Sequence, residues 1–312
     1  MAGKRRKNKT VAHGSRIADT VNIFFLSAVS LVMVLPLLFI LNHSFKPVQE
    51  LFLFPPRFLV REPTLDNFRD LFFAVRLSVV PISRFILNSA IVTVGAVGIS
   101  MTIGSMAAFA MSKLRFPGKD FLFGAIIVAL MFAPQAVQIT RYLVVSRIGV
   151  MNSYLGHLLP QVALPVGVFL IKQFMDQVPT SLIESAQIDG ATDWTVYAKI
   201  VMPLVLPAIA TAGILAFQAV WTDQSTSQYY MTDEAMRTLP YFVSSLHSQV
   251  TAGGGAEIMA SLPGQARAGQ ATQIARAGAA AAAGFIMFVP NFLIFVALKK
   301  SMVSTLVNSG IK

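Results

Sequence analysis

The chain has 312 residues, of which 55% are hydrophobic and only 12% are charged. This composition, with its several long uncharged stretches, excludes an ordinary soluble domain and predicts a membrane protein that crosses the bilayer several times. The absence of cysteine excludes disulfides and thiolate metal sites, and the net charge of +11 is dispersed among segments that flank the apolar stretches, without a basic-aromatic nucleic-acid motif.

The first apolar segment follows a basic N-terminal tail, K-R-R-K-N-K. Residues 21–41 are long enough to span a bilayer. A cleaved signal peptide is the alternative, but its apolar core is shorter and ends at a small-residue cleavage site, whereas this segment continues into Asn42. We therefore expect residues 1–20 to form a cytoplasmic tail and residues 21–312 to form one transmembrane domain, in which residues 45–84 are a proline-rich extramembrane segment.

Five more apolar segments predict further spans, which makes six in all: residues 85–111, 121–139, 155–174, 204–221 and 279–298. The second span of the chain carries six small or amide residues, which favour close helix packing inside a bundle: Asn88, Ser89, Gly95, Gly98, Gly104 and Ser105. The third is interrupted by Pro134, whose freed carbonyl needs a neighbouring group or a water-lined cavity. Gln135 and Gln138 are therefore candidate substrate-pathway residues, with hydrogen bonding between helices as the alternative.

A polar segment, residues 178–207, separates the fourth and fifth spans and predicts a helix, a sharp turn and a second helix. Pro179 suits the entry to the first helix, and Ser181 with Glu184 three residues later predicts a capping box. Gly190 can adopt the left-handed conformation that ends a helix.

The second helix of this segment begins at Thr192 or Asp193, either of which can cap it. Its residues Trp194, Tyr197, Ile200 and Val201 share one face by their spacing, and an exposed face of this kind needs a partner. Pro203 and Pro207 then let the chain bend back into an apolar run. Taken alone, these residues also fit an amphipathic hairpin that lies at the lipid interface.

The string E-S-A-Q-I-D-G-A, followed eight residues later by I-V-M-P-L-V-L-P, resembles the EAA motif in permease subunits of binding-protein-dependent ATP-binding cassette (ABC) importers. The matching residues are Glu184, Ala186, Asp189, Gly190, Ala191, Ile200, Pro203 and Pro207, while Ser185 replaces an alanine. The resemblance implies an all-α membrane protein with a type I importer bundle, in which this loop is a cytoplasmic coupling helix that contacts the ATPase. The D-G-A form and residues 133–156 are most similar to maltose-type carbohydrate permeases.

Basic residues predict the orientation. The N-terminal tail and the short link at residues 112–119 carry many lysines and arginines close to spans, which favours a cytoplasmic location for both. This orientation also places residues 184–190 in the cytoplasm, and residues 223–278 outside. That outer loop is rich in glycine and alanine and is longer than the resemblance leads one to expect, so we predict a flexible excursion. Alternatively, residues 256–276 continue the sixth helix outward.

Catalytic chemistry is not expected in this chain. No G-x-x-x-x-G-K-[ST] phosphate loop is present, since Gly118-Lys119 is followed by Asp120, and the four histidines lack metal-ligand spacing. Asp223 and Trp221, at the outer end of the fifth span, are candidates for contact with a sugar. The alternative is an interface anchor with the tryptophan at headgroup depth.

The sequence therefore predicts the permease subunit of an ATP-driven sugar importer in a bacterial cell membrane, without a cofactor or metal of its own. By resemblance it forms half of a translocation pathway with a second permease subunit, two ATPase subunits that bind ATP and Mg, and an extracytoplasmic sugar-binding protein. Import of another small solute is the first alternative. An ion-coupled transporter would need ionisable residues within the spans, and a membrane scaffold would not need the coupling element. Basic residues expected outside hint at acidic saccharides: Arg57, Arg61, Arg69, Arg76, Arg84, Arg141 and Arg147.

Overall fold

The computed structural model describes residues 16–51, 58–73, 80–252 and 265–309, and within these ranges every regular element is helical. By length and composition, four helical runs can each cross a membrane: Thr20–Phe45, Ile82–Lys113, Asp193–Trp221 and Ala277–Lys299. They belong to α1 (Arg16–Phe45), α4 (Ile82–Lys113), the run of α10 (Asp193–Thr195), η1 (Val196–Val201) and α11 (Met202–Trp221), and α15 (Gln265–Ser309). The chain is thus an all-helical membrane protein.

A fifth candidate crossing is broken into two helices. α7 (Tyr154–Val162) and α8 (Pro165–Asp176) meet at 44° across a short break. Pro165 occupies the first turn of α8, where its missing N–H costs nothing, while the residue before a proline is driven out of the helical conformation. The expected span over residues 155–174 corresponds to this bent pair, which together is long and apolar enough for one broken span.

The expected third span, residues 121–139, differs from the prediction. α5 (Lys119–Met131) ends three residues before Pro134, and a separate helix, α6 (Gln138–Ile148), follows. The 13 residues of α5 rise only about 20 Å, less than a hydrocarbon core of about 30 Å. A proline both breaks the helix ladder and restricts its predecessor, so the interruption expected at Pro134 divides residues 121–139 between two helices, and α5 alone is not among the candidate spans.

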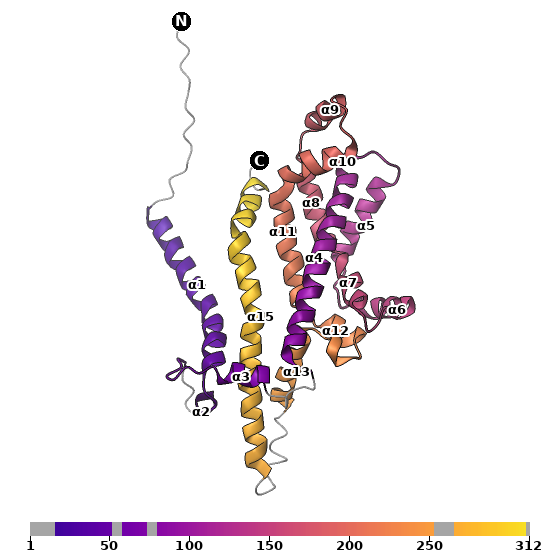
Figure 1. Ribbon diagram of the computed structural model, residues 1–312. Helices are drawn as coiled ribbons and strands as arrows, with labels where there is room; N and C mark the ends of the chain where they lie inside the picture. The colour runs from indigo at the N-terminus through magenta and orange to yellow at the C-terminus, as the bar shows by residue number, and fades with distance from the viewer. Residues whose placement is uncertain (1–15, 52–57, 74–79, 253–264, 310–312) are drawn as a thin grey trace.

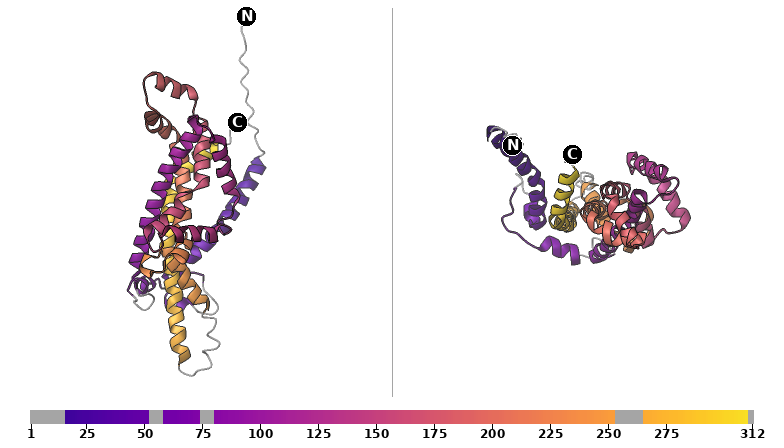
Figure 2. Two further views of the ribbon diagram at one scale, coloured as in Figure 1. Left: turned by 90° about the vertical axis from the view of Figure 1, so that its right-hand side faces the viewer. Right: turned by 90° about the horizontal axis from the view of Figure 1, so that it is seen from above.

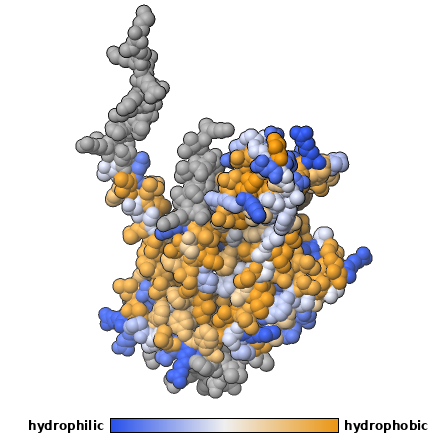
Figure 3. All heavy atoms as spheres, turned by 45° about the horizontal axis from the view of Figure 1, so that its top comes forward, coloured by the Kyte–Doolittle hydropathy of each residue, from blue (hydrophilic) through white to orange (hydrophobic). Residues whose placement is uncertain are grey.

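The helices pack as an elongated bundle (Figure 1, Figure 2). α4, α8 and α11 contact one another, α15 lies against α11, and α1 packs against α15 at the side of the bundle. A helix of the polar segment, α9 (Thr180–Ile188), projects from one end of the molecule, the end at which α1 starts and α4 and α15 end. Apolar residues cover most of the flank seen in Figure 3, and hydrophilic residues gather toward the ends, as lipid contact requires.

The small residues of α4 mostly pack as expected. Asn88, Ser89, Gly104 and Ser105 are buried, and a Cβ on Gly95 would lie 3.0 Å from the Leu158 side chain of α7. Gly98 is different, because it is exposed and a Cβ there would have nothing within 4 Å. Within this chain, close packing explains five of the six positions.

The end opposite α9 is built from short helices. α2 (Val48–Leu51) and α3 (Asp66–Phe73) belong to the segment expected to be extramembrane, and α12 (Ser225–Tyr230), the 3₁₀ turn η2 (Glu234–Met236) and α13 (Leu239–Ala252) form much of the connection predicted as a flexible loop. Residues 223–252 are thus ordered rather than a free excursion. α15 already begins at Gln265, so the alternative of an outward-extended sixth helix holds from that residue, while 253–264 lie outside the described part.

Candidate functional site

The first helix of the polar segment is α9, and it begins without the expected capping box. Pro179 occupies the N-cap position and no side chain caps the helix there. Because the helix starts at Thr180, Ser181 already lies within the first turn and cannot serve as the cap whose oxygen accepts from the third residue. Glu184 is instead exposed on the surface of α9.

The turn after α9 is closed by Gly190 as predicted. Its φ is +82°, in the left-handed region. The Ala191 N–H donates to the Ala186 carbonyl over 2.9 Å, and the Gly190 N–H donates to the Gln187 carbonyl over 3.0 Å. These two bonds define a Schellman motif, with Gly190 at the position that only glycine adopts without strain. The D-G-A sequence of the motif therefore forms this turn, with the glycine at its left-handed position.

The second helix starts at Thr192, whose Oγ1 accepts from the Thr195 N–H over 3.3 Å. Residues Val196–Val201 then form a π-helical turn, η1, that leads into α11. Of the face predicted to need a partner, Tyr197 and Val201 are buried against α4 and α8, while Trp194 stays 63% exposed. Pro203 lies in the first turn of α11, and the helix continues through Pro207.

Tyr197 joins this segment to the middle of the bundle. Its hydroxyl lies 2.8 Å from Ser105 Oγ of α4, and its ring lies 5.3 Å from that of Phe109. Ser105 is fully buried and Tyr197 is 7% exposed. A buried hydroxyl pair of this kind satisfies two polar groups that lipid and protein would otherwise leave without partners.

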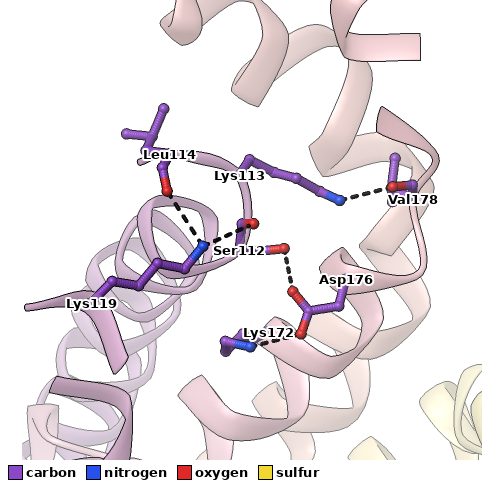
Figure 4. A network of polar contacts seen from close by, with 7 residues as sticks. All are labelled: Ser112, Lys113, Leu114, Lys119, Lys172, Asp176 and Val178. Carbon is purple, nitrogen blue, oxygen red and sulfur yellow. Dashed lines mark hydrogen bonds and ion pairs between the residues drawn. The ribbon is translucent and has the colours of Figure 1, made fainter. Parts of the chain in front are cut away.

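A polar network fastens the base of α9 to α4 and α8 (Figure 4). Lys113 Nζ donates to the Val178 carbonyl over 2.8 Å. Asp176 accepts from Ser112 Oγ over 2.6 Å and pairs with Lys172 Nζ at 2.7 Å. The network ties the chain just before Pro179 to the last turn of α4, so the entry to α9 has a fixed position.

The tip formed by α9, the turn and α10, residues 179–195, carries exposed apolar side chains. Ile188 is 86% exposed, Trp194 is 63% exposed and Leu182 is 46% exposed. Glu184 and Asp189, from the sequence motif, are exposed beside them. The sequence motif identified the acidic residues and the turn. It did not identify Leu182 and Ile188 as surface residues, because their exposure depends on how α9 projects from the bundle.

The four substrate-pathway candidates are not brought together. Gln135 is exposed in the α5–α6 connection, and Gln138 is half-buried at the start of α6. Trp221 is buried at 6% exposure, and its Nε1 donates to the Met287 carbonyl of α15 over 2.9 Å. Within this chain the indole thus packs between α11 and α15.

Asp223 serves a local structural role. Its Oδ1 accepts from the N–H and hydroxyl of Ser225, and its Oδ2 accepts from the N–H and hydroxyl of Thr226. These bonds satisfy the first amides of α12 in the manner of a capping carboxylate. Both carboxylate oxygens of Asp223 therefore accept hydrogen bonds from residues of this chain.

Comparison with known proteins supplies the wider context. No family model matches the chain. It is similar to the polygalacturonan/rhamnogalacturonan transport system permease protein YtcP of Bacillus subtilis, at 31% identity over 223 residues, which cover 71% of this chain and 75% of that protein. It is also similar to the trehalose transport system permease protein SugB of Mycobacterium tuberculosis, at 29% identity over 68% of this chain and 75% of that protein.

A solved structure shares the fold. It is the crystal structure of a bacterial ABC transporter involved in the import of the acidic polysaccharide alginate, and one of its chains superposes with a TM-score of 0.75 at 19% identity. The likeness covers 92% of this chain and 98% of the other. The fold therefore agrees with the sequence relatives over almost the whole chain.

Proposed function

The chain belongs to the permease subunits of binding-protein-dependent ABC sugar importers, which are non-enzymatic transmembrane components, and from this premise we propose that the tip at residues 179–195 is where an ATPase subunit docks. The wider coupling element is the segment 178–207, with Glu184, Ala186, Asp189, Gly190, Ala191, Pro203 and Pro207 as its motif residues. It converts ATP hydrolysis by the partner into movement of the membrane helices.

The observation that carries this proposal is the exposed apolar surface of the tip. Ile188 is 86% exposed and Trp194 is 63% exposed, although both lie beside charged residues at an end of the bundle. Burying one such side chain is worth about 1.5–3 kcal/mol. Glu184, Asp189 and Asp193 on the same tip oppose burial in lipid, so a protein surface with both apolar and polar groups is the fitting partner.

We place this end of the molecule in the cytoplasm. The start of α1, the end of α4, the tip and the end of α15 all lie at one end (Figure 1). Lys113, Arg115 and Lys119 lie at that end, in a short link between helices, where the positive-inside rule weighs basic residues most. The tip therefore meets the compartment that holds ATP.

The proposed assembly pairs this chain with a second permease subunit, two ATPase subunits and an extracytoplasmic sugar-binding protein. The partners bind ATP and Mg. In this assembly α5 and the connection through Gln135 to α6 complete a sixth crossing, and each permease subunit supplies half of the pathway by alternating access. An ion-coupled transporter is disfavoured, because the described candidate spans α4 and α11 carry ionisable residues only in the first and last turns of α4.

We propose that the transported solute is an oligosaccharide. The relatives named above transport sugars according to their names, both a uronic-acid polymer and trehalose. Acidic and neutral sugars therefore both fit the family, so the proposal names oligosaccharides as a class and no particular charge.

The test is docking measured with the intact assembly. Ile188→Ser is expected to weaken co-purification of the ATPase subunit by roughly tenfold to a hundredfold, since isoleucine burial of about 1.5–3 kcal/mol is lost. The matched control is Leu59→Ser, because Leu59 is also exposed, at 68%, but lies in the segment before α3, away from the tip. Wild-type docking of Ile188→Ser would contradict the proposal, as would equal loss in both variants.

A further inference from the structure

The end opposite the tip carries a segment whose backbone is held almost entirely by side chains. This segment, Met231–Thr238, connects α12 to α13, contains the 3₁₀ turn η2, and is called here the distal strap. It has few backbone bonds to neighbouring elements, so its polar groups need other partners. Those partners come from α4, α7 and α12 and from Asn152, two residues before α7.

Asn88 of α4 holds the centre of the distal strap. Its Nδ2 donates to the carbonyls of Ala235 and Arg237, each over 2.8 Å, and its Oδ1 accepts from the Tyr154 hydroxyl over 2.8 Å. Asn88 is fully buried, so both hydrogens of the amide are used where water cannot replace them. Arg84, one turn earlier on α4, adds a bond from Nε to the Ala235 carbonyl over 3.2 Å.

His157 of α7 holds the carbonyl between these two. Its Nε2 lies 3.0 Å from the Met236 carbonyl, and because a carbonyl only accepts, Nε2 carries the proton. Its Nδ1 lies 2.9 Å from the Thr226 hydroxyl of α12, which is in turn bonded to Asp223. The fully buried imidazole therefore connects α7, α12 and the strap.

The amides of the distal strap are satisfied in the same way. Asn152 Oδ1 accepts from the N–H groups of Thr232 and Asp233 over 2.9 and 3.0 Å. Ser227 Oγ accepts from the Thr238 N–H over 2.9 Å, and Ser89 Oγ of α4 accepts from the next amide, that of Leu239, over 2.8 Å. Both ends of the strap and its centre are thus fixed by side chains.

α4 is the helix that both ends of the molecule share. The distal strap is bonded to Asn88 and Ser89 near its start, and the base of the tip is bonded to Ser112 and Lys113 at its end. The helix between Asn88 and Lys113 is about 38 Å long. Tyr197 also bonds to Ser105 along this length, so α4 connects the strap to the coupling element without an intervening loop.

We propose that Asn88 is a positioning residue that fixes the distal strap on α4, so that contact with the extracytoplasmic binding protein at the strap's end of the molecule reaches the coupling element through this helix. This rests on the proposed function. Six side chains hold the strap, which makes it a fixed part of the α4 body rather than a moving gate. If the distal strap is released from α4, binding-protein contact no longer reaches the coupling element, while the tip at residues 179–195 can still dock.

The test compares two isosteric variants of the same strap contacts. Asn88→Asp removes both N–H donors and sets a carboxylate against two carbonyls. Asn152→Asp keeps the oxygen that accepts two N–H groups, and the Thr232 hydroxyl, now bonded to Asn152 Nδ2 over 2.6 Å, can donate to the new oxygen. In the assembled transporter, Asn88→Asp should retain ATPase co-purification and basal hydrolysis, and should reduce stimulation by sugar-loaded binding protein at least about tenfold. Asn152→Asp should stay within about twofold of wild type.

A second readout needs no partner subunit. Hydrogen exchange of the amides from Thr232 to Leu239 should be at least about tenfold faster in Asn88→Asp than in wild type, and nearly unchanged in Asn152→Asp. If Asn88→Asp fails to assemble, Tyr154→Phe is the substitute variant, because it removes only the hydroxyl that orients the Asn88 amide. It should also lower the stimulation of ATP hydrolysis by sugar-loaded binding protein, by a smaller factor.

Wild-type stimulation together with wild-type exchange in Asn88→Asp would overturn the inference. So would fast exchange with unchanged stimulation, since the strap would then be held without any effect on signalling. Absence of any stimulated ATPase activity in the wild-type assembly is a different result. It would refute the proposed function, while the exchange data would still test whether Asn88 holds the strap.

Discussion

Replacement of Gly190 by valine tests whether the shape of the turn, rather than its charge, makes the tip a docking element. Gly190 has φ +82°, and a Cβ built there meets nothing within 4 Å. The cost of Gly190→Val is therefore backbone strain alone, about 1–2 kcal/mol for a residue held in the left-handed region and more for a β-branched one. Relief of that strain breaks the bonds from Ala191 to Ala186 and from Gly190 to Gln187.

A penalty of this size changes the population of the docking-competent turn by roughly fivefold to thirtyfold. We expect Gly190→Val to remain in the membrane, because the bundle contacts of α8 and α11 are untouched, while ATPase subunits dissociate or hydrolyse ATP without transport. Co-purification, ATPase rate and sugar uptake in vesicles measure the three consequences separately. Wild-type values of all three would refute the reasoning.

The control is Gly118→Val, in the link between α4 and α5. Gly118 has φ +84° and likewise nothing within 4 Å of a Cβ, so the local strain is matched. We expect Gly118→Val to retain most coupling, because this link is not part of the tip. Equal uncoupling in both variants would attribute the effect to general strain. Glu184→Lys leaves the turn intact and should also weaken docking, since it reverses an exposed charge on α9.

Three further outcomes are expected. Deletion of residues 253–269, which we propose contact the binding protein, should preserve assembly and basal ATP hydrolysis but weaken stimulation by sugar-loaded binding protein, and unchanged uptake would make the segment a spacer. Ser105→Ala should lower the unfolding free energy by about 1–3 kcal/mol, because it leaves the buried Tyr197 hydroxyl unpaired. Tyr197→Phe should cost less, about 0.5–1.5 kcal/mol, because Ser105 Oγ keeps its bond to the Thr102 carbonyl, and the double variant should cost less than the sum in a thermal-unfolding cycle. Trp221→Phe should cost about 1 kcal/mol through loss of the bond to the Met287 carbonyl, and should leave sugar preference unchanged in competition uptake; an altered preference would place the indole in the pathway.

The sequence by itself determined the membrane class and the local structure of the tip. Hydrophobic length identifies a span from composition alone, and α1, α4 and α11 lie close to where it predicted them. Gly190 was predictable because a left-handed position after a helix is a local requirement that almost only glycine meets. Thr192 was predictable as a cap for the same reason, since its bond reaches only three residues along the chain.

Only the tertiary structure decided which polar groups meet across the bundle. Asn88 and Ala235 are separated by 147 positions, and Ser105 and Tyr197 by 92. No periodicity specifies such a pair, because the partner depends on how two helices are placed. Pro134 likewise indicated a break but not that α5 would stop short, and the bend between α7 and α8 was not predicted. The burial of Trp221 and the exposure of Ile188 did not follow from either residue's local sequence, since burial is a property of the packed bundle and not of the segment.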